Sequence, residues 1–384
     1  VKLVLVLVLL WSVHLGEPPS WSFIMAPGME FALGADANSV LFVTLSAVLW
    51  FFTTLYAVGY LEGSPHRSRF FGFFSLCVSA TVGLALAGNL FTFVIFYELL
   101  TLATYPLVAH RGTPEALRGA RIYLTYTLIG GVLLLIGTVW LHVIAGPTPF
   151  VEGGVLSRVP AEYHPQLKVI FLLLLIGLGV KAALVPLHGW LPQAMVAPAP
   201  VSALLHAVAV VKGGVFFILK VTLYVFGIDL VAELQTTQWL LYVAAATILL
   251  ASLVALSQDN LKARLAYSTI SQLGFMIMGL AAGSYFAGVY HLTTHAGFKA
   301  LLFLCSGVFI HAYESNDIFE ISDRGGRRLK TPTICIIIAA AALAGLPPLS
   351  GFFSKELILA ALADLNNPIW LVAGLLGAFS TAYY

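Results

Sequence analysis

The stretch KVIFLLLLIGLGVKAALVP, at residues 168–186, decides the class of fold. Its apolar run approaches the ~20 residues that an α-helix needs to cross the ~30 Å hydrocarbon core of a bilayer. The run nevertheless contains Lys181, and it ends at Pro186, whose missing N–H interrupts the hydrogen-bond ladder of a helix. An ionisable group inside such a helix is costly unless it faces a protein interior or a wet cavity. The stretch therefore predicts a membrane protein with a polar interior.

The composition of the whole chain agrees with several such helices. Of 384 residues, 60% are hydrophobic and 9% are charged, whereas soluble domains carry about 25% charged residues. We expect an all-α polytopic membrane protein, and the formal net charge of +2 gives no indication of a nucleic-acid partner. Apolar length and loop punctuation place about twelve spanning segments at residues 1–14, 39–61, 70–88, 90–109, 121–144, 168–196, 200–226, 238–257, 264–282, 285–311, 331–364 and 368–384.

Two of these segments are interrupted, and the interruptions resemble each other. Pro186-Leu-His-Gly-Trp-Leu in the first is similar to Pro348-Leu-Ser-Gly-Phe-Phe in the second, at an offset of 162 residues (348 − 186). This offset covers five spanning segments, and an odd number of crossings inverts the second copy. Inverted repeats with broken helices are typical of transporters. We therefore divide the chain into incomplete N-terminal helices at 1–69, a first five-helix repeat at 70–226, and an inverted, C-terminally incomplete repeat at 238–384.

The charges of the loops predict the orientation in the membrane. Loops on one face carry eleven basic residues, whereas those on the other face carry only Arg158 and Lys168. The positive-inside rule places the more basic face in the cytoplasm. Its loops lie at residues 62–69, 110–121, 258–264 and 312–330, and they contribute Arg67, Arg69, Arg111, Arg118, Arg121, Lys262, Arg264, Arg324, Arg327, Arg328 and Lys330.

Both ends of the sequence are expected to be truncated. The chain starts at Val1 without a methionine, and it stops at Tyr384 inside an apolar run. The first run, residues 1–13, has the length of a signal-peptide core, but no small-residue cleavage pattern follows it. We therefore interpret this run as part of a spanning helix.

Ionisable side chains lie inside the predicted spanning segments. Lys2 carries little weight because it lies at the chain end. The others suggest a path for protons or ions through the bilayer. The full set is Lys2, Lys181, Lys212, Lys220, Lys299, Lys355 and Glu98.

Glu98 and Lys181 form the first candidate pair. Glu98 lies near the middle of its helix, and Lys181 lies just before the Pro186 break. A nearby lysine would hold a buried carboxylate in its charged form. The pair is interpreted as a functional switch, and the alternative is a structural buried ion pair.

Lys212 follows His206, and the neighbouring Gly213 and Gly214 leave room for close helix approach or local water. A lysine at this depth is able to accept and release a proton. The structural alternative is a side chain that snorkels to the interface. That alternative suits Lys220 better, so Lys220 and His206 are secondary candidates.

His291, His295 and Lys299 are spaced four residues apart, which stacks them along one helix face. Two histidines at this spacing also occur in zinc sites, but the required glutamate between them and a third ligand are missing. Histidine titrates near neutral pH, so a line of such groups favours proton hopping through intervening water. A merely structural polar face is the alternative.

Lys355, beside Glu356, follows the second break and is expected to terminate the relay, although a charge pair at a helix end is also possible there.

Cys77, Cys305 and Cys335 lie in separate apolar segments without metal-ligand spacing. The sequence has no phosphate-binding loop and no dinucleotide fingerprint. We therefore predict no cofactor and no metal site.

Five motifs, in order, resemble the proton-conducting membrane subunits shared by respiratory complex I, membrane-bound hydrogenases and Mrp-type cation/proton antiporters. They start at Leu187, Pro200, Leu265, His291 and Gly345, and they read LHGWLP, PVSALLH, LAYSTISQLG, HLTTHAGFKA and GLPPLSGFFSKE. The resemblance runs from about Ala35 to the end of the chain. It implies a fold of fourteen helices with two inverted five-helix repeats, of which about twelve helices are expected here.

The resemblance also implies roles for individual residues. By this comparison the relay comprises Glu98 on the fifth helix, Lys181 on the seventh, Lys212 on the eighth, His291, His295 and Lys299 on the eleventh, and Lys355 on the twelfth.

The histidine line and Lys355 in its FSKE motif look like the large antiporter-like subunit of complex I and its Mrp counterparts. Two further positions depart from the patterns of relatives. Lys212 stands where the large antiporter-like subunit of complex I often lacks a lysine, which favours a protein like the D-type subunit of Mrp antiporters or like a hydrogenase subunit. Gln193 stands where many relatives carry aspartate, so a secondary polar contact is in doubt.

We expect proton translocation by one subunit of a multisubunit monovalent cation/proton antiporter. The alternatives are a proton-pumping subunit of NADH:quinone oxidoreductase (complex I) or of a membrane-bound hydrogenase, and a scaffold that does not transport. In a redox complex the enzymatic activity would belong to the assembly, since this chain shows no redox site. Expected partners are other membrane subunits, the lipid bilayer, and protons together with sodium or potassium. The expected location is the inner (plasma) membrane of a prokaryote.

Overall fold

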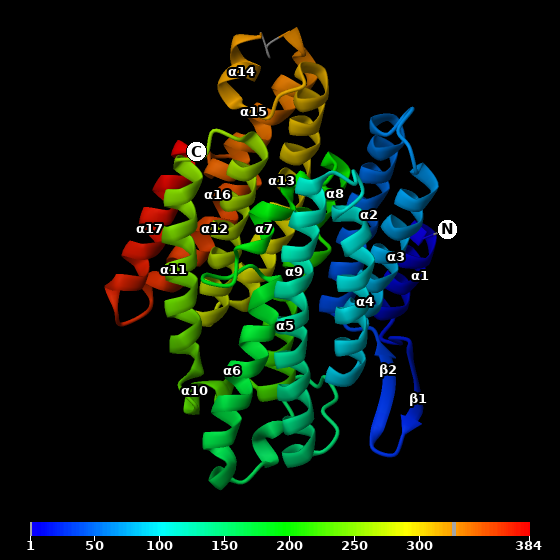
Figure 1. Cartoon of the computed structure of the whole chain (residues 1–384). Coiled ribbons are helices and arrows are strands. Elements are labelled where there is room, and N and C mark those ends of the chain that lie inside the picture. Colours follow the sequence, from blue (N-terminus) through cyan, green and yellow to red (C-terminus); the bar gives the residue numbers. More distant parts are fainter. Residues whose placement is uncertain (1, 325–327) are drawn as a thin grey trace.

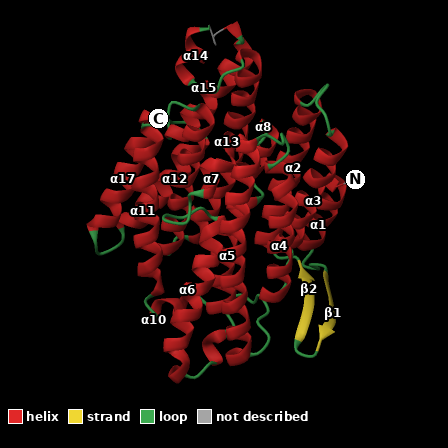
Figure 2. Cartoon of the chain, viewed as in Figure 1, coloured by secondary structure: helices red, strands yellow, loops and turns green. Residues whose placement is uncertain are grey.

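The computed structural model describes residues 2–324 and 328–384, and it shows long helices that run side by side (Figure 1). Helix dominates the regular structure (Figure 2), which confirms the predicted all-α polytopic membrane fold. The α-helices are α1 (Lys2–His14), α2 (Ala37–Tyr60), α3 (Arg67–Ala85), α4 (Leu90–Val108), α5 (Pro114–Ala145), α6 (His164–Lys181), α7 (Trp190–Gln193), α8 (Ala199–Ala207), α9 (Val210–Lys220), α10 (Ile228–Glu233), α11 (Thr236–Leu256), α12 (Leu261–Ala281), α13 (Tyr285–Tyr313), α14 (Ile318–Asp323), α15 (Lys330–Ala344), α16 (Ser350–Ala363) and α17 (Pro368–Tyr383).

Within the described residues, eight helical segments are long and apolar enough to cross a membrane. Helices α1, α15 and α17 are shorter and apolar. Helix α12 has 21 residues and is almost wholly buried, and its serine, threonine and glutamine side chains make it less apolar than its neighbours. The polar residues of this helix therefore face protein rather than lipid.

Several helices begin at side chains that cap their free N–H groups. Asp36 caps α2 by accepting a hydrogen bond from the Ser39 N–H at 2.8 Å, and Asn89 caps α4 in the same way through Thr92. Thr113 caps α5, so this helix begins seven residues before the predicted segment at 121–144. Such caps satisfy backbone donors that the first turn leaves without partners.

Both predicted helix breaks are present. Helix α6 ends at Lys181, and a turn with Ala183 at φ +50° leads through Pro186 to α7. In the second break α15 ends at Ala344, directly before Gly345 at φ +87°, and α16 begins at Ser350. A left-handed residue of this kind ends a helix readily when it is glycine.

The predicted segment at 200–226 is present as the candidate membrane span Ala199–Phe226, although its helix is interrupted. Helix α8 ends at Ala207, and α9 begins at Val210 after the interruption at Val208. After Lys220 the chain continues as a π-helix, Val221–Phe226. Neither proline nor glycine marks the interruption at Val208, so proline and glycine punctuation gave no signal for it.

A β-hairpin precedes α2, and sequence analysis missed it. Strand β1 (Ser20–Ala26) pairs antiparallel with β2 (Met29–Gly34). The turn contains Pro27-Gly28, a dipeptide that favours chain reversal. The hairpin lies at the lower end of the bundle in Figure 1, where α10 also lies.

Helix α13 joins the two halves of the bundle. It packs against α8 and α2 and also against α12, α15 and α16. The links that carry most basic residues adjoin one another at the end where α14 lies (Figure 1): the Leu261 N–H donates to Asn316 O at 2.8 Å, and Arg69 donates to His110 O at 3.1 Å. We call this end the basic end; Arg327, counted above, lies outside the described residues. The division at 1–69, 70–226 and 238–384 stays a prediction.

Candidate functional site

Buried titratable side chains gather around α13. His291, His295 and Lys299 are each 0% exposed, in agreement with a single inward face. Lys212 and His206, from α9 and α8, are equally buried and lie within electrostatic reach of Lys299. The structure therefore brings together candidates from both halves of the chain.

Lys181 is fully buried at the end of α6, and its ammonium binds α4. Its Nζ donates to the Tyr97 carbonyl and lies 3.4 Å from the centroid of the Tyr97 ring. The Tyr97 hydroxyl in turn donates to Gly177 O at 2.8 Å. A backbone carbonyl and an aromatic face thus stabilise the lysine, as expected for a desolvated cation.

Glu98 follows Tyr97 on α4 and is half-buried. Its carboxylate packs on α5 so closely that a Cβ added at Gly131 would lie 1.6 Å from Glu98 Oε1. Glu98 and Lys181 interact electrostatically, but no ion pair within 4.0 Å joins these two described residues. The predicted pair is therefore adjacent without being in direct contact.

Lys212 lies just after the interruption at Val208, and its Nζ has no protein hydrogen-bond partner among the described residues. Its helix approaches the end of α6 closely, since a Cβ at Gly214 would lie 2.4 Å from Ala182 N. This contact sets the Lys212 turn of α9 beside the Lys181 turn of α6.

Other buried polar atoms near Lys212 also lack protein partners in the described part of the chain. They include both ring nitrogens of His295 and Nδ1 of His206. Buried polar groups in native proteins are almost always satisfied by protein or by ordered water. The arrangement thus suits a line of internal water between α8, α9 and α13.

His291 belongs to a fully connected network. Its Nε2 is 3.0 Å from Gln272 Oε1 on α12, and its Nδ1 is 2.8 Å from Ser354 Oγ on α16. Because the amide oxygen only accepts, Nε2 carries the proton and Nδ1 accepts from the serine hydroxyl. Gln272 also donates to Thr381 of α17 at 3.3 Å.

The two lysines of the second half each bind one neighbouring helix. Lys299 Nζ donates to Ser268 Oγ on α12, and Lys355 Nζ donates to Leu343 O at 2.6 Å, near the end of α15. Lys355 is 4% exposed and within electrostatic reach of both Lys299 and His291. The candidates Lys212, His291, His295, Lys299 and Lys355 are thus all buried and near one another, and we call this set the central file.

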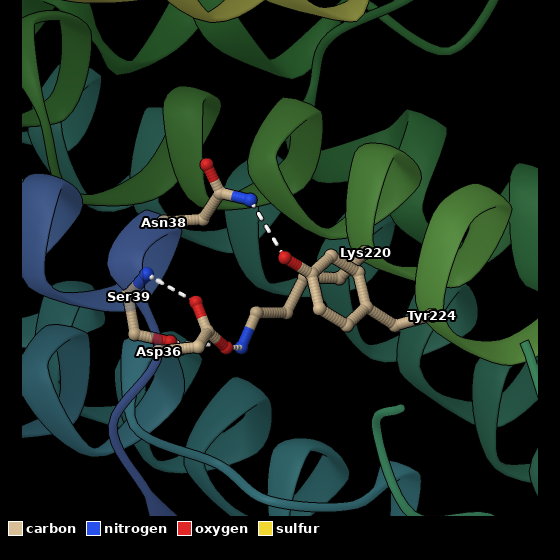
Figure 3. Close-up of polar contacts among 5 residues, drawn as sticks. All are labelled: Asp36, Asn38, Ser39, Lys220 and Tyr224. Atoms are coloured by element: carbon tan, nitrogen blue, oxygen red, sulfur yellow. Dashed lines mark hydrogen bonds and ion pairs between the residues drawn. The ribbon is translucent and has the colours of Figure 1, made fainter. Parts of the chain in front are cut away.

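Lys220 lies outside the central file. Its Nζ forms an ion pair with Asp36 Oδ2 at 2.7 Å and donates to Ser39 Oγ at 2.8 Å, while Asn38 donates to the Tyr224 hydroxyl (Figure 3). Asp36 is 29% exposed at the N-terminus of α2. Lys220 itself is only 1% exposed, so Asp36 neutralises its ammonium inside the protein, and the lysine does not snorkel to the interface.

Sequence analysis missed the polar partners Ser268, Gln272 and Ser354. Each lies in a motif quoted above and inside a spanning segment. A polar residue in such a segment was the signal that could have identified each of them as part of the site. Sequence analysis also missed two contact residues. Asp36 binds Lys220, which is distant in the sequence, and Met195 contacts His206 across a turn. Within the described residues, no group of three or more histidine, cysteine, aspartate or glutamate side chains is arranged to hold a metal ion.

The fold and the site together define the class: this is a membrane protein built as a bundle of many helices, with lysines and histidines buried inside it. Residues 87–381 match the family model described as "NADH:quinone oxidoreductase/Mrp antiporter, TM". The chain belongs to this family.

Curated relatives carry two kinds of name. The chain is 34% identical to "NAD(P)H-quinone oxidoreductase chain 5" of Synechocystis, over 95% of this chain and 54% of that protein. It is also 34% identical to a probable K(+)/H(+) antiporter subunit of Rhizobium meliloti, over 93% of this chain and 36% of the relative. Escherichia coli "NADH-quinone oxidoreductase subunit L" is 35% identical over 95% of this chain and 60% of its own length. The chain thus spans only about a third to three-fifths of these relatives.

Solved structures have the same fold. A chain of the Mrp complex from Dietzia sp. superposes with a TM-score of 0.85 at 27% identity, over 99% of this chain and 43% of that one. A chain of an archaeal membrane-bound sulfane sulfur reductase gives a TM-score of 0.88 at 24% identity, over 100% of this chain and 79% of the other, and supports the fold alone.

Proposed function

We propose that this chain moves protons across a membrane as one subunit of a multisubunit monovalent cation/proton antiporter. The observation that carries the proposal is the central file, in which buried ionisable groups from α9, α13 and α16 adjoin one another and polar side chains of α12. Buried charges at this depth are costly, and a functional role explains their presence. The similarity to antiporter subunits and to an Mrp complex supports the same function.

In the proposed mechanism, Lys181 and Glu98 act as a switch at one end. In this structure the Lys181 ammonium donates to the Tyr97 carbonyl. Movement of that ammonium toward Glu98 would change the electrostatic field at Lys212. Such a shift needs a difference in stability between two charge states. Lys212 would then pass its proton by way of His291, His295 and Lys299 to Lys355.

A second candidate function is proton pumping within NADH:quinone oxidoreductase or a membrane-bound hydrogenase. The names of the relatives from Synechocystis and Escherichia coli favour the quinone enzyme. None of the three relatives named above is described as a D-type Mrp protein, so that narrower expectation stays a prediction. The proposed location is the inner membrane, with the basic end in the cytoplasm. Sodium or potassium as the coupling ion, and a prokaryotic source, are part of the proposal.

The test is proton flux in vesicles that contain the assembled complex. Glu98→Gln and Lys212→Ala are expected to abolish coupled flux, because each removes one titratable group of the proposed path. Lys330→Ala is the matched control, since Lys330 is exposed at the start of α15. Unchanged flux in both Glu98→Gln and Lys212→Ala would favour the non-transporting scaffold.

A cation gradient should drive flux in the antiporter, whereas quinone reduction should drive it in a redox complex. This comparison separates the two transporting candidates without any variant.

A further inference from the structure

A cavity of about 440 Å³ opens at the basic end of the bundle. It has room for a group of water molecules, each of which occupies about 30 Å³ in the liquid. Many of the side chains in its wall are polar, and they come from the links α4–α5, α11–α12 and α13–α14 and from the first turns of α5 and α12. They include Arg111, Thr113, Glu115, Asn260, Lys262 and Asn316.

Met195 forms part of the cavity wall and also contacts the buried interior. It lies on the 3₁₀ turn Ala194–Val196, and its Sδ is 3.2 Å from His206 Nε2. His206 is 0% exposed and stacks on Phe303 with ring centroids 4.4 Å apart. The Met195 side chain thus touches both the cavity and a buried histidine.

His206 leads from this thioether to the central file. Its ring lies within electrostatic reach of Lys212, Lys299 and His295. Its second nitrogen, Nδ1, has no protein partner among the described residues. The imidazole is therefore placed to pass a proton from one nitrogen to the other.

Lys262 holds the turn that carries Met195. Its Nζ, at the start of α12, donates to Ala197 O, and Ala197 directly follows the 3₁₀ turn. Lys262 is only 6% exposed although it lines the cavity, so its ammonium points into the protein. The position of Met195 over His206 therefore depends on a contact between α12 and this turn.

We propose that the cavity is the vestibule through which protons enter from the basic end, and that Met195 is the positioning residue that closes it on His206. This inference rests on the proposed function. A thioether is only a weak hydrogen-bond acceptor and not a donor, so it interrupts a chain of water molecules. Methionine has three rotatable bonds, and displacement of its side chain would connect the cavity to His206.

The test measures passive proton leak through the complete complex in vesicles, without the coupling ion or substrate. Met195→Ala is expected to raise the leak at least about ten-fold, the effect of removing ~1.4 kcal/mol from a barrier. Met195→Leu keeps the bulk and should stay near the wild-type rate. Val196→Ala, on the same turn, is the control for a general loosening of the wall, and Lys262→Met should raise the leak by freeing the turn.

A labelling experiment gives a readout that does not depend on proton flux. Met195→Cys is placed in a background in which Cys77, Cys305 and Cys335 are replaced by alanine. A membrane-impermeant cationic thiol reagent should modify this cysteine from the basic end alone. If the complex with Met195→Ala does not assemble, Met195→Ser replaces it in the leak measurement.

The inference is overturned if the leak of Met195→Ala equals that of Met195→Leu and wild type, or if the cysteine is not labelled from the basic end. Failure of the proposed function itself looks different: Glu98→Gln and Lys212→Ala would then leave coupled flux intact. Loss of coupled flux in those two variants, with no effect of the Met195 variants, would overturn the vestibule alone.

Discussion

Lys220 and Asp36 form an ion pair of 2.7 Å that ties the end of α9 to the first turn of α2. The lysine is 1% exposed, and three aromatic rings, of Phe150, Phe216 and Tyr224, lie within 5.6 Å of its ammonium. The carboxylate also caps α2 through its other oxygen. One aspartate therefore joins helix capping to the neutralisation of a buried charge.

Asp36→Asn should destabilise the protein by about 3 kcal/mol, because removal of one partner leaves the other charge buried and unpaired. Lys220→Met with Asp36→Asn should recover part of the loss, since no uncompensated charge remains. Thermal unfolding in detergent measures both effects. Full stability of Asp36→Asn alone would contradict the structural role, and proton flux in the double variant should remain close to wild type.

Gly131→Ala should impair transport through Glu98. The new methyl group would lie 1.6 Å from the present position of Glu98 Oε1, so the carboxylate has to move away from α5. We expect coupled proton flux to fall about ten-fold, which corresponds to ~1.4 kcal/mol in a barrier. Gly297→Ala on α13 is the control, because a Cβ there meets no atom within 4 Å.

Gly214→Ala should separate α9 from α6. Its Cβ would lie 2.4 Å from Ala182 N, and backbone cannot move aside as a flexible side chain does. Overpacking of this kind costs about 1–3 kcal/mol and would change the distance between Lys181 and Lys212. The adjacent Gly213→Ala is a close control, since its Cβ would be 3.7 Å from Leu84. Equal flux and equal melting temperature in the two variants would argue against the proposed contact.

Gln272→Leu should disable His291. The ring nitrogen Nε2 would lose its acceptor inside the protein, at a cost of about 1–3 kcal/mol for a buried unsatisfied donor. The histidine would then be free to change tautomer, so both stability and coupled flux should fall. Gln238→Leu, on the exposed first turn of α11, should change neither quantity. Melting curves and vesicle flux together check this prediction.

Sequence reasoning found those features that depend on local chemistry. Proline predicted both helix breaks, because Pro186 and Pro348 act on their own segments; the residue that ends α15, Gly345, was not singled out. The spacing of His291, His295 and Lys299 predicted one buried face, because helix periodicity alone determines it. The Pro27-Gly28 turn carried a comparable local signal for the hairpin, which our helix-based segmentation did not use.

Features that depend on distant contacts were out of reach. Asp36 and Lys220 are 184 residues apart, and the sequence around either residue does not indicate that the other is its partner. The interruption at Val208 has no proline or glycine, and the Tyr97 carbonyl that binds Lys181 is invisible in a sequence. Charge alone placed Lys181 near Glu98, but it could not show that a backbone carbonyl and an aromatic ring hold the lysine.

The length of α13 has a consequence for membrane voltage. The helix has 29 residues, and Lys299 lies 14 residues after its first residue, Tyr285 (299 − 285). At 1.5 Å per residue the ammonium-bearing residue is about 21 Å along a helix of roughly 43 Å, close to its midpoint. A full crossing of 100 mV is worth ~2.3 kcal/mol per charge, so a proton at Lys299 would feel about half of that. Occupancy of this lysine should therefore follow the electrical potential as well as pH.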